Sequence, residues 1–124
     1  MEKNDGKKYD LGERTFDFAQ SIRAFCKSIK LNVINIDDVK QVIRSSGSVG
    51  ANYIEAQEAF SKKDFYHRIK ICRKEAKESN YWLELIVLED SETESTKNQK
   101  NKLAEEAIEL TKIFGAIINK NKDE

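Results

Sequence analysis

The clearest pattern in the sequence is KKDFYHRIKICRKEAKESNYWLELIVLE, residues 62–89. Its apolar and small residues recur at steps of four and three, the spacing of one face of an α-helix. They are Phe65, Ile69, Cys72, Ala76, Ser79, Leu83 and Ile86. Ser61 precedes the stretch and Asp64 follows three positions later, as in a capping box. The stretch therefore predicts a helix over Lys62–Glu89 with one side in a core.

Three further segments around this stretch show the same spacing. They predict helices over Leu11–Ile29, Asp37–Phe60 and Lys97–Asn119, with the polar stretch Asp90–Thr96 as a loop. Their predicted core residues are Leu11, Phe18, Ile22, Phe25 and Ile29; Val39, Val42, Ile43, Ser46, Val49, Tyr53, Gln57 and Phe60; and Leu103, Ala107, Leu110, Phe114 and Ile117. Because short loops join long helices, we predict an all-α fold, an antiparallel up-down-up-down four-helix bundle. Its ordered core spans about residues 10–119, and residues 120–124 are expected to fray.

The composition fits one helical domain of 124 residues, with no proline and only five glycines. The formal net charge is zero, so bulk charge predicts no partner. Met1–Tyr9 lacks the apolar run of a signal peptide, and the longest apolar run, Leu85–Leu88, is far too short to span a membrane. Cys26 and Cys72 have no metal-ligand spacing and predict reduced, buried thiols in a cytoplasmic protein, with a disulfide as the alternative.

Two glycines, Gly47 and Gly50, stand inside the second predicted helix. Each costs about 1 kcal/mol of helix stability relative to alanine. We expect them to permit close backbone approach to a neighbouring helix, with a break in the helix as the alternative.

One side of the third predicted helix is basic. Lys63, His67, Lys70, Lys74 and Lys77 are spaced by four and three and lie opposite the predicted core face. From Lys62 to Lys77 there are seven Lys or Arg and two acids, whereas Glu78–Glu94 holds six acids and no base. This basic stripe is either a solvated face or a surface that contacts the phosphates of RNA or DNA. Few aromatic residues lie near it, so base stacking is not indicated.

Two further surfaces predict contact with another chain. Tyr81, Trp82, Leu85 and Leu88 make the end of the third helix apolar on nearly all sides, which predicts an interface with a second subunit or a partner. The alternative is that the following loop and the fourth helix cover them. Ser48, Asn52 and Glu55 lie together on the second helix near Arg44. They either form an ordinary solvated surface or, beside the glycine-rich stretch, form hydrogen bonds across such an interface.

Catalysis is not expected. The pattern Asp64-x-x-His67 is half of a carboxylate–histidine pattern, but a di-iron bundle needs two such motifs and two more inward-facing glutamates. His67 is also predicted to point away from the core. Cys72 belongs to the core face, which argues against a Cys–His nucleophile. No glycine-rich phosphate loop is present, and the paired acids Glu75 and Glu78 have no evident substrate pocket. We therefore expect no enzyme activity, no metal and no cofactor.

Three blocks of the sequence resemble a bacterial four-helix bundle family. The blocks are RTFDFA at 14–19, RSSGSVGANYIEA at 44–56, and DF at 64–65 with KEAKESNYWLEL at 74–85. That family includes proteins encoded in intervening sequences of 23S rRNA genes and is related to the accessory variability proteins of diversity-generating retroelements. Relatives more often have glycine and then a hydroxyl residue where this chain has Ser46 and Gly47.

The resemblance implies a bundle that assembles as a homo-oligomer, in known relatives a ring of five subunits. It also implies RNA or DNA, a reverse transcriptase or another protein as partners. Two functional hypotheses follow. The chain is either an oligomeric accessory protein that binds nucleic acid or a structural, protein-binding module without that activity. Salt-dependent binding of nucleic acid distinguishes the two.

Overall fold

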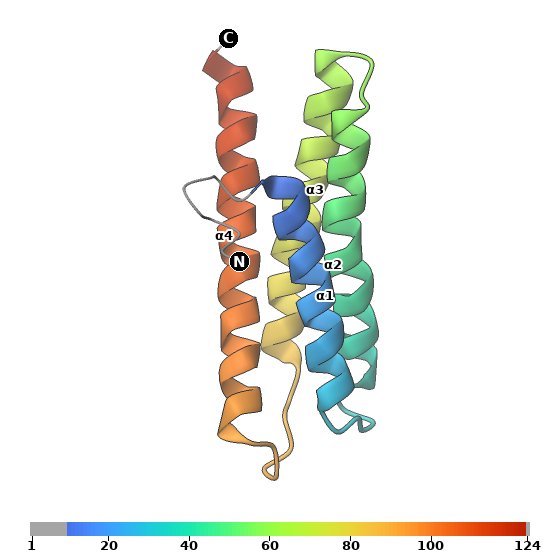
Figure 1. The fold of residues 1–124 in the computed structure, drawn as a ribbon, viewed down its shortest axis with the longest axis vertical. Helices are drawn as coiled ribbons and strands as arrows, with labels where there is room; N and C mark the ends of the chain where they lie inside the picture. Colours follow the sequence, from blue (N-terminus) through green and yellow to red (C-terminus); the bar gives the residue numbers. More distant parts are fainter. Residues whose placement is uncertain (1–9, 124) are drawn as a thin grey trace, which may run out of the picture.

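The structure, a computed structural model, describes residues 10–123, with side chains placed to residue 121. It consists of helices α1 (Leu11–Ser28), α2 (Ile36–Gln57), α3 (Lys62–Leu85) and α4 (Glu94–Asp123). Figure 1 shows them side by side, with α1 and α3 running in one direction and α2 and α4 in the other. Each helix packs against the next, and α4 packs back against α1, so α1 and α3 lie diagonally opposite. The predicted all-α four-helix bundle is confirmed.

Polar caps set where three of the helices begin. Oδ1 of Asp10 accepts a hydrogen bond from the backbone N–H of Glu13 at 2.8 Å, and Oγ of Ser61 accepts from that of Asp64 at 3.1 Å. Both bonds satisfy N–H groups that the first helical turn leaves without partners. Thr93 caps α4 in the same way, through the N–H of Thr96 at 3.1 Å. Helix α4 therefore begins at Glu94, three residues before the predicted Lys97.

The core follows the predicted apolar faces of all four helices. Its largest fully buried side chains include Phe25 and Phe114, Ile22, Ile69 and Ile86, and Leu83 and Leu110. Each fully buried side chain of this size stabilises the fold by roughly 1.5–3 kcal/mol relative to its exposed state. Burial of these faces is therefore a main source of the bundle's stability.

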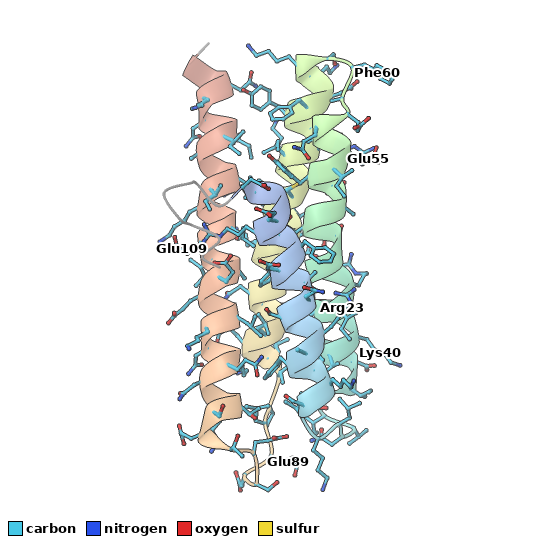
Figure 2. All side chains as sticks on the ribbon, in the orientation of Figure 1. Arg23, Lys40, Glu55, Phe60, Glu89 and Glu109 are labelled. Carbon is cyan, nitrogen blue, oxygen red and sulfur yellow. The ribbon has the colours of Figure 1, made fainter. Side chains whose placement is uncertain are left out.

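Phe60 and Gln57 contradict the predicted core face of the second helix. Helix α2 ends at Gln57, whose side chain is exposed, and the Phe60 side chain is 100% exposed. The N–H of Glu58 bonds to the carbonyls of both Ile54 and Glu55, so the last turn tightens and the chain leaves the helix. Figure 2 shows Phe60 at the end of the bundle, in the loop between α2 and α3.

The two glycines of α2 lie in a continuous helix, so a helix break is excluded, and the predicted close approach to α1 is confirmed at Gly50. A Cβ atom at Gly50 would lie 3.1 Å from Oγ1 of Thr15, and one at Gly47 would lie 3.2 Å from the guanidinium of Arg23. The absence of a side chain at Gly50 lets the backbones of α1 and α2 approach each other.

Helix α3 ends at Leu85, four residues before the predicted Glu89. The chain then runs extended, with φ −61° and ψ 117° at Ile86. The fully buried Asn35, in the α1–α2 loop, donates hydrogen bonds from Nδ2 to the carbonyls of Lys30 (3.1 Å) and Val87 (3.3 Å). These bonds tie the α1–α2 loop to the extended segment. They also give the Val87 carbonyl, which is not part of a helix, a hydrogen-bond donor.

The C-terminal end of α4 also differs from the prediction. Residues 120–123, expected to fray, continue the helix to Asp123, and the sequence there contains no glycine or proline to stop it. Glu124 and Met1–Tyr9, where a signal peptide was judged absent, lie outside the described residues.

Cys26 and Cys72 are free and buried, as predicted. Burial raises the pKa of the Cys26 thiol to about 11 and that of the Cys72 thiol to about 12. Cys72 also donates a hydrogen bond from Sγ to the carbonyl of Val49 at 3.4 Å. Both thiols are therefore protonated core groups at neutral pH.

Candidate functional site

The basic stripe is a single exposed surface of α3. All five side chains, Lys63, His67, Lys70, Lys74 and Lys77, are exposed, and Ile69, Cys72 and Ala76 on the other side of the helix are buried. The predicted arrangement on one face is therefore confirmed. Of these groups, Lys74 lies near an acid, with Nζ 3.9 Å from Oε2 of Glu78. Solvated ammonium groups in a row can contact successive phosphates without reading bases.

Ser48 and Asn52 form hydrogen bonds inside the subunit. Nδ2 of Asn52 donates to the carbonyl oxygen and to Oγ of Ser48, both at 2.9 Å. Oδ1 of Asn52 accepts from the guanidinium of Arg68 on α3 at 3.0 Å. Glu55 is exposed on the same helix. Asn52 thus helps join α2 to α3, and Ser48 holds its side chain in place.

A buried carboxylate lies in the seam between α2 and α3. The Glu75 side chain is 9% exposed, and its Oε1 lies 3.3 Å from the guanidinium of Arg44 but accepts no hydrogen bond. Beside it, the hydroxyls of Ser45 and Ser79 are 2.8 Å apart. The sequence reading treated Glu75 only as a possible catalytic acid. The signal in the sequence for its burial was its position directly before the core residue Ala76, on the side of the helix that faces α2.

The predicted interface at the end of α3 is smaller than expected. Leu88 lies in the extended segment instead of on a helix, and both Leu88 and Trp82 pack against the core. Tyr81 and Leu85 remain exposed, at 58% and 42%. A helix apolar all round was therefore a wrong prediction, because the chain leaves the helix and folds part of this surface inward. Nε1 of Trp82 is buried without a hydrogen-bond partner.

A groove between α1 and α2 was not predicted. It has a volume of about 390 Å³, is mainly apolar, and has small residues on both helices. Its lining residues include Gly12, Ala19, Gly47, Gly50 and Ala51. Phe16 and Ile54 also line it, with 61% and 59% of their surfaces exposed. Arg23 lies at one end and donates to the carbonyl of Ile43 at 3.4 Å (Figure 2). Phe16 falls outside the core spacing of α1, which was the only signal in the sequence.

Within residues 10–123, no group of three or more His, Cys, Asp or Glu side chains is arranged to hold a metal ion. No helix in this part of the chain is long and apolar enough to cross a membrane.

Comparison with known proteins places the chain in a family. The model of the 23S rRNA-intervening sequence proteins matches residues 7–116. The chain belongs to the 23S rRNA-intervening sequence protein family. A solved structure from Bacteroides thetaiotaomicron VPI-5482, described as a protein with unknown function from the S23 ribosomal protein family, is 32% identical. The match covers 88% of this chain and 98% of that chain, with a TM-score of 0.72. Curated proteins contain no match to this chain.

The family match includes the three features described above. Residues 7–116 contain the basic stripe of α3, the α1–α2 groove and the polar seam between α2 and α3. The resemblance to this family, which rested on three short blocks of sequence, is therefore confirmed over nearly the whole bundle.

Proposed function

We propose that this protein is a non-catalytic, homo-oligomeric bundle that binds nucleic acid through the basic stripe of α3. The observation that carries the proposal is the exposure of Lys63, Lys70, Lys74 and Lys77, with His67 between them, on one continuous helix face. The family description links these proteins to 23S rRNA genes, which makes RNA the first nucleic acid to test.

Lysines on a helix face bind phosphates as separate point charges. Such contacts tolerate any base sequence and weaken as salt rises, because each neutralised phosphate releases counterions. A homo-oligomer would repeat the stripe once per subunit, so that weak contacts add along one strand. Five is the number of subunits that the resemblance implies.

The test is fluorescence anisotropy with labelled single- and double-stranded RNA and DNA at low and at physiological salt. We expect binding that falls steeply with salt and is abolished by Lys→Glu changes at 63, 70, 74 and 77. A control with Lys→Glu at the exposed positions 40, 102, 112 and 120 has the same charge change and should retain more binding. Equal loss in both variants, or no binding at tens of micromolar protein, would contradict the proposal.

A second candidate function is a protein-binding module that does not contact nucleic acid. The apolar α1–α2 groove, with Phe16 and Ile54 exposed beside it, favours this candidate. Size-exclusion chromatography with light scattering, with and without RNA, distinguishes the two candidates. For a protein-binding module, the measured mass of the oligomer should be the same with and without RNA.

A further inference from the structure

We infer that α1 of one subunit packs alongside α3 of a second copy, parallel to it, so that subunits join head to tail. This inference rests on the self-association proposed above and names its surfaces. The α1 ridge consists of Glu13, Phe16, Gln20 and Arg23, and the α3 ridge consists of Arg68, Ile71, Glu75 and Glu78. The α1 ridge is exposed throughout, and the α3 ridge is half-buried or buried along the seam with α2.

The two ridges have the same spacing. Each steps by three, four and three residues, so each forms a line along one side of its helix. Because α1 and α3 run in the same direction (Figure 1), a parallel contact keeps the order of the four positions. Every position of one ridge then meets its counterpart on the other.

The ridges also lie at the same height in the bundle, as contacts with α2 show. Thr15, next to Phe16, lies against Gly50, and Cys72, next to Ile71, bonds to the adjacent Val49. Near the other end, Arg23 donates to Ile43, while the neighbouring residue of α2, Arg44, lies 3.4 Å from Oε1 of Glu78. Subunits joined through these ridges need no shift along the bundle axis, which allows a closed ring instead of an open filament.

The facing groups are chemically complementary. Glu13 would meet Arg68, and Arg23 would meet Glu78, so both ends of the contact pair opposite charges. Phe16 would pack on Ile71 in the middle and remove part of the exposed apolar surface of the α1–α2 groove from water.

The remaining pair places an amide beside the buried carboxylate. Gln20 would face Glu75, whose Oε1 accepts no hydrogen bond within the subunit. The Gln20 amide would lie over the 9% of the Glu75 side chain that is exposed, since Oε1 itself is enclosed within the subunit. Because Oε1 of Glu75 already lies 3.3 Å from the Arg44 guanidinium, this pair places a neutral amide between the two charged ends of the contact and adds no unpaired charge.

A head-to-tail arrangement follows from where the ridges lie. The α1 ridge borders the α1–α2 side of the bundle, and the α3 ridge borders the α2–α3 side. Each subunit therefore offers two different surfaces, which generate a heterologous contact instead of a two-fold dimer.

The test uses one variant for each ridge. Phe16→Glu disables the α1 ridge, and Glu78→Arg reverses the charge that would meet Arg23. Light scattering should show each variant alone as a monomer under conditions where the wild-type chain is an oligomer. Mixed in equal amounts, the two variants should form a 1:1 dimer, because each keeps one intact ridge. Ile108→Glu, at an exposed apolar residue of α4, is the control and should leave the oligomer intact.

The outcomes separate this inference from the self-association on which it rests. A monomeric wild-type chain contradicts both. A wild-type oligomer that Phe16→Glu leaves unchanged, or a mixture that forms no dimer, overturns only the choice of surfaces. If circular dichroism shows that Phe16→Glu does not fold, Gln20→Glu replaces it at an exposed position. This variant sets a second carboxylate against Glu75 and should raise the subunit dissociation constant about tenfold or more.

Discussion

A Cβ atom added to Gly50 would lie 3.1 Å from Oγ1 of Thr15 and 3.4 Å from its Cβ. Thr15 cannot easily move, because it is buried and its hydroxyl donates to the carbonyls of Leu11 and Gly12. We expect Gly50→Ala to lower the free energy of unfolding despite a gain of about 1 kcal/mol in helix propensity. Urea denaturation measures the difference.

Gly47→Ala provides the matched comparison within the same helix. Its new methyl group would meet only the guanidinium of Arg23, the end of a flexible, exposed side chain. The propensity gain should then prevail and raise the free energy of unfolding by up to about 1 kcal/mol. The same sign of change for both variants would contradict the account of close packing at Gly50.

The contact between α1 and α4 includes one strong ion pair. Nε and Nη2 of Arg14 donate to the two carboxylate oxygens of Glu106 at 2.7 and 2.8 Å, and these hydrogen bonds raise the pKa of Arg14. We expect Glu106→Gln to cost about 1 kcal/mol of stability at low salt and less at high salt, because screening weakens the pair. Glu105→Gln, at the exposed neighbouring acid, should have little effect.

Asn35 should tolerate substitution poorly, because its side chain holds two loops together. Asn35→Ala removes the donors to the carbonyls of Lys30 and Val87, and we expect a loss of about 2 kcal/mol or more. Asn35→Asp should be worse at pH 7, since a buried carboxylate cannot donate to either carbonyl, and should recover part of the loss at acidic pH. Thermal denaturation at two pH values tests both expectations.

Because of the two buried cysteines, the free energy of unfolding should decrease at alkaline pH. Their ordinary pKa is about 9, and burial raises it to about 11 for Cys26 and about 12 for Cys72. The unfolded chain loses these protons first, so the stability contribution is full below pH 9 and declines as pH rises through 11 to 12. We also expect no reaction with a thiol reagent at pH 8 until urea unfolds the chain. Rapid labelling of the folded chain would contradict the burial of both thiols.

The sequence predicted the helices and the core well because spacing in the chain fixes which face of a helix is apolar. It predicted the basic stripe for the same reason, since Lys63 and Lys77 lie on one helix at known angular positions. It missed the end of α3 because that end depends on Asn35, which is distant in sequence and captures the carbonyl of Val87.

Burial of Glu75 and exposure of Phe16 were missed for a related reason. Both lie at the edge of a helix face, where the neighbouring helix decides whether a side chain is covered. Gly50 brings α2 close to α1 along the groove, and Phe16 lies uncovered beside it; spacing within α1 places Phe16 off the core face but cannot show the groove. The packing order of the helices, not their individual patterns, determines such positions.

The short length of α1 has a consequence for how the bundle opens. Figure 1 shows α1 beginning well below the end of the bundle that α2, α3 and α4 reach, and α1 packs against α2 and α4 but not α3. We expect α1 to detach in a partial unfolding event that leaves the other helices paired, so its amide hydrogens should exchange before theirs. If α1 packs against a neighbouring subunit, assembly would suppress this local opening, and the exchange protection of α1 would depend on protein concentration.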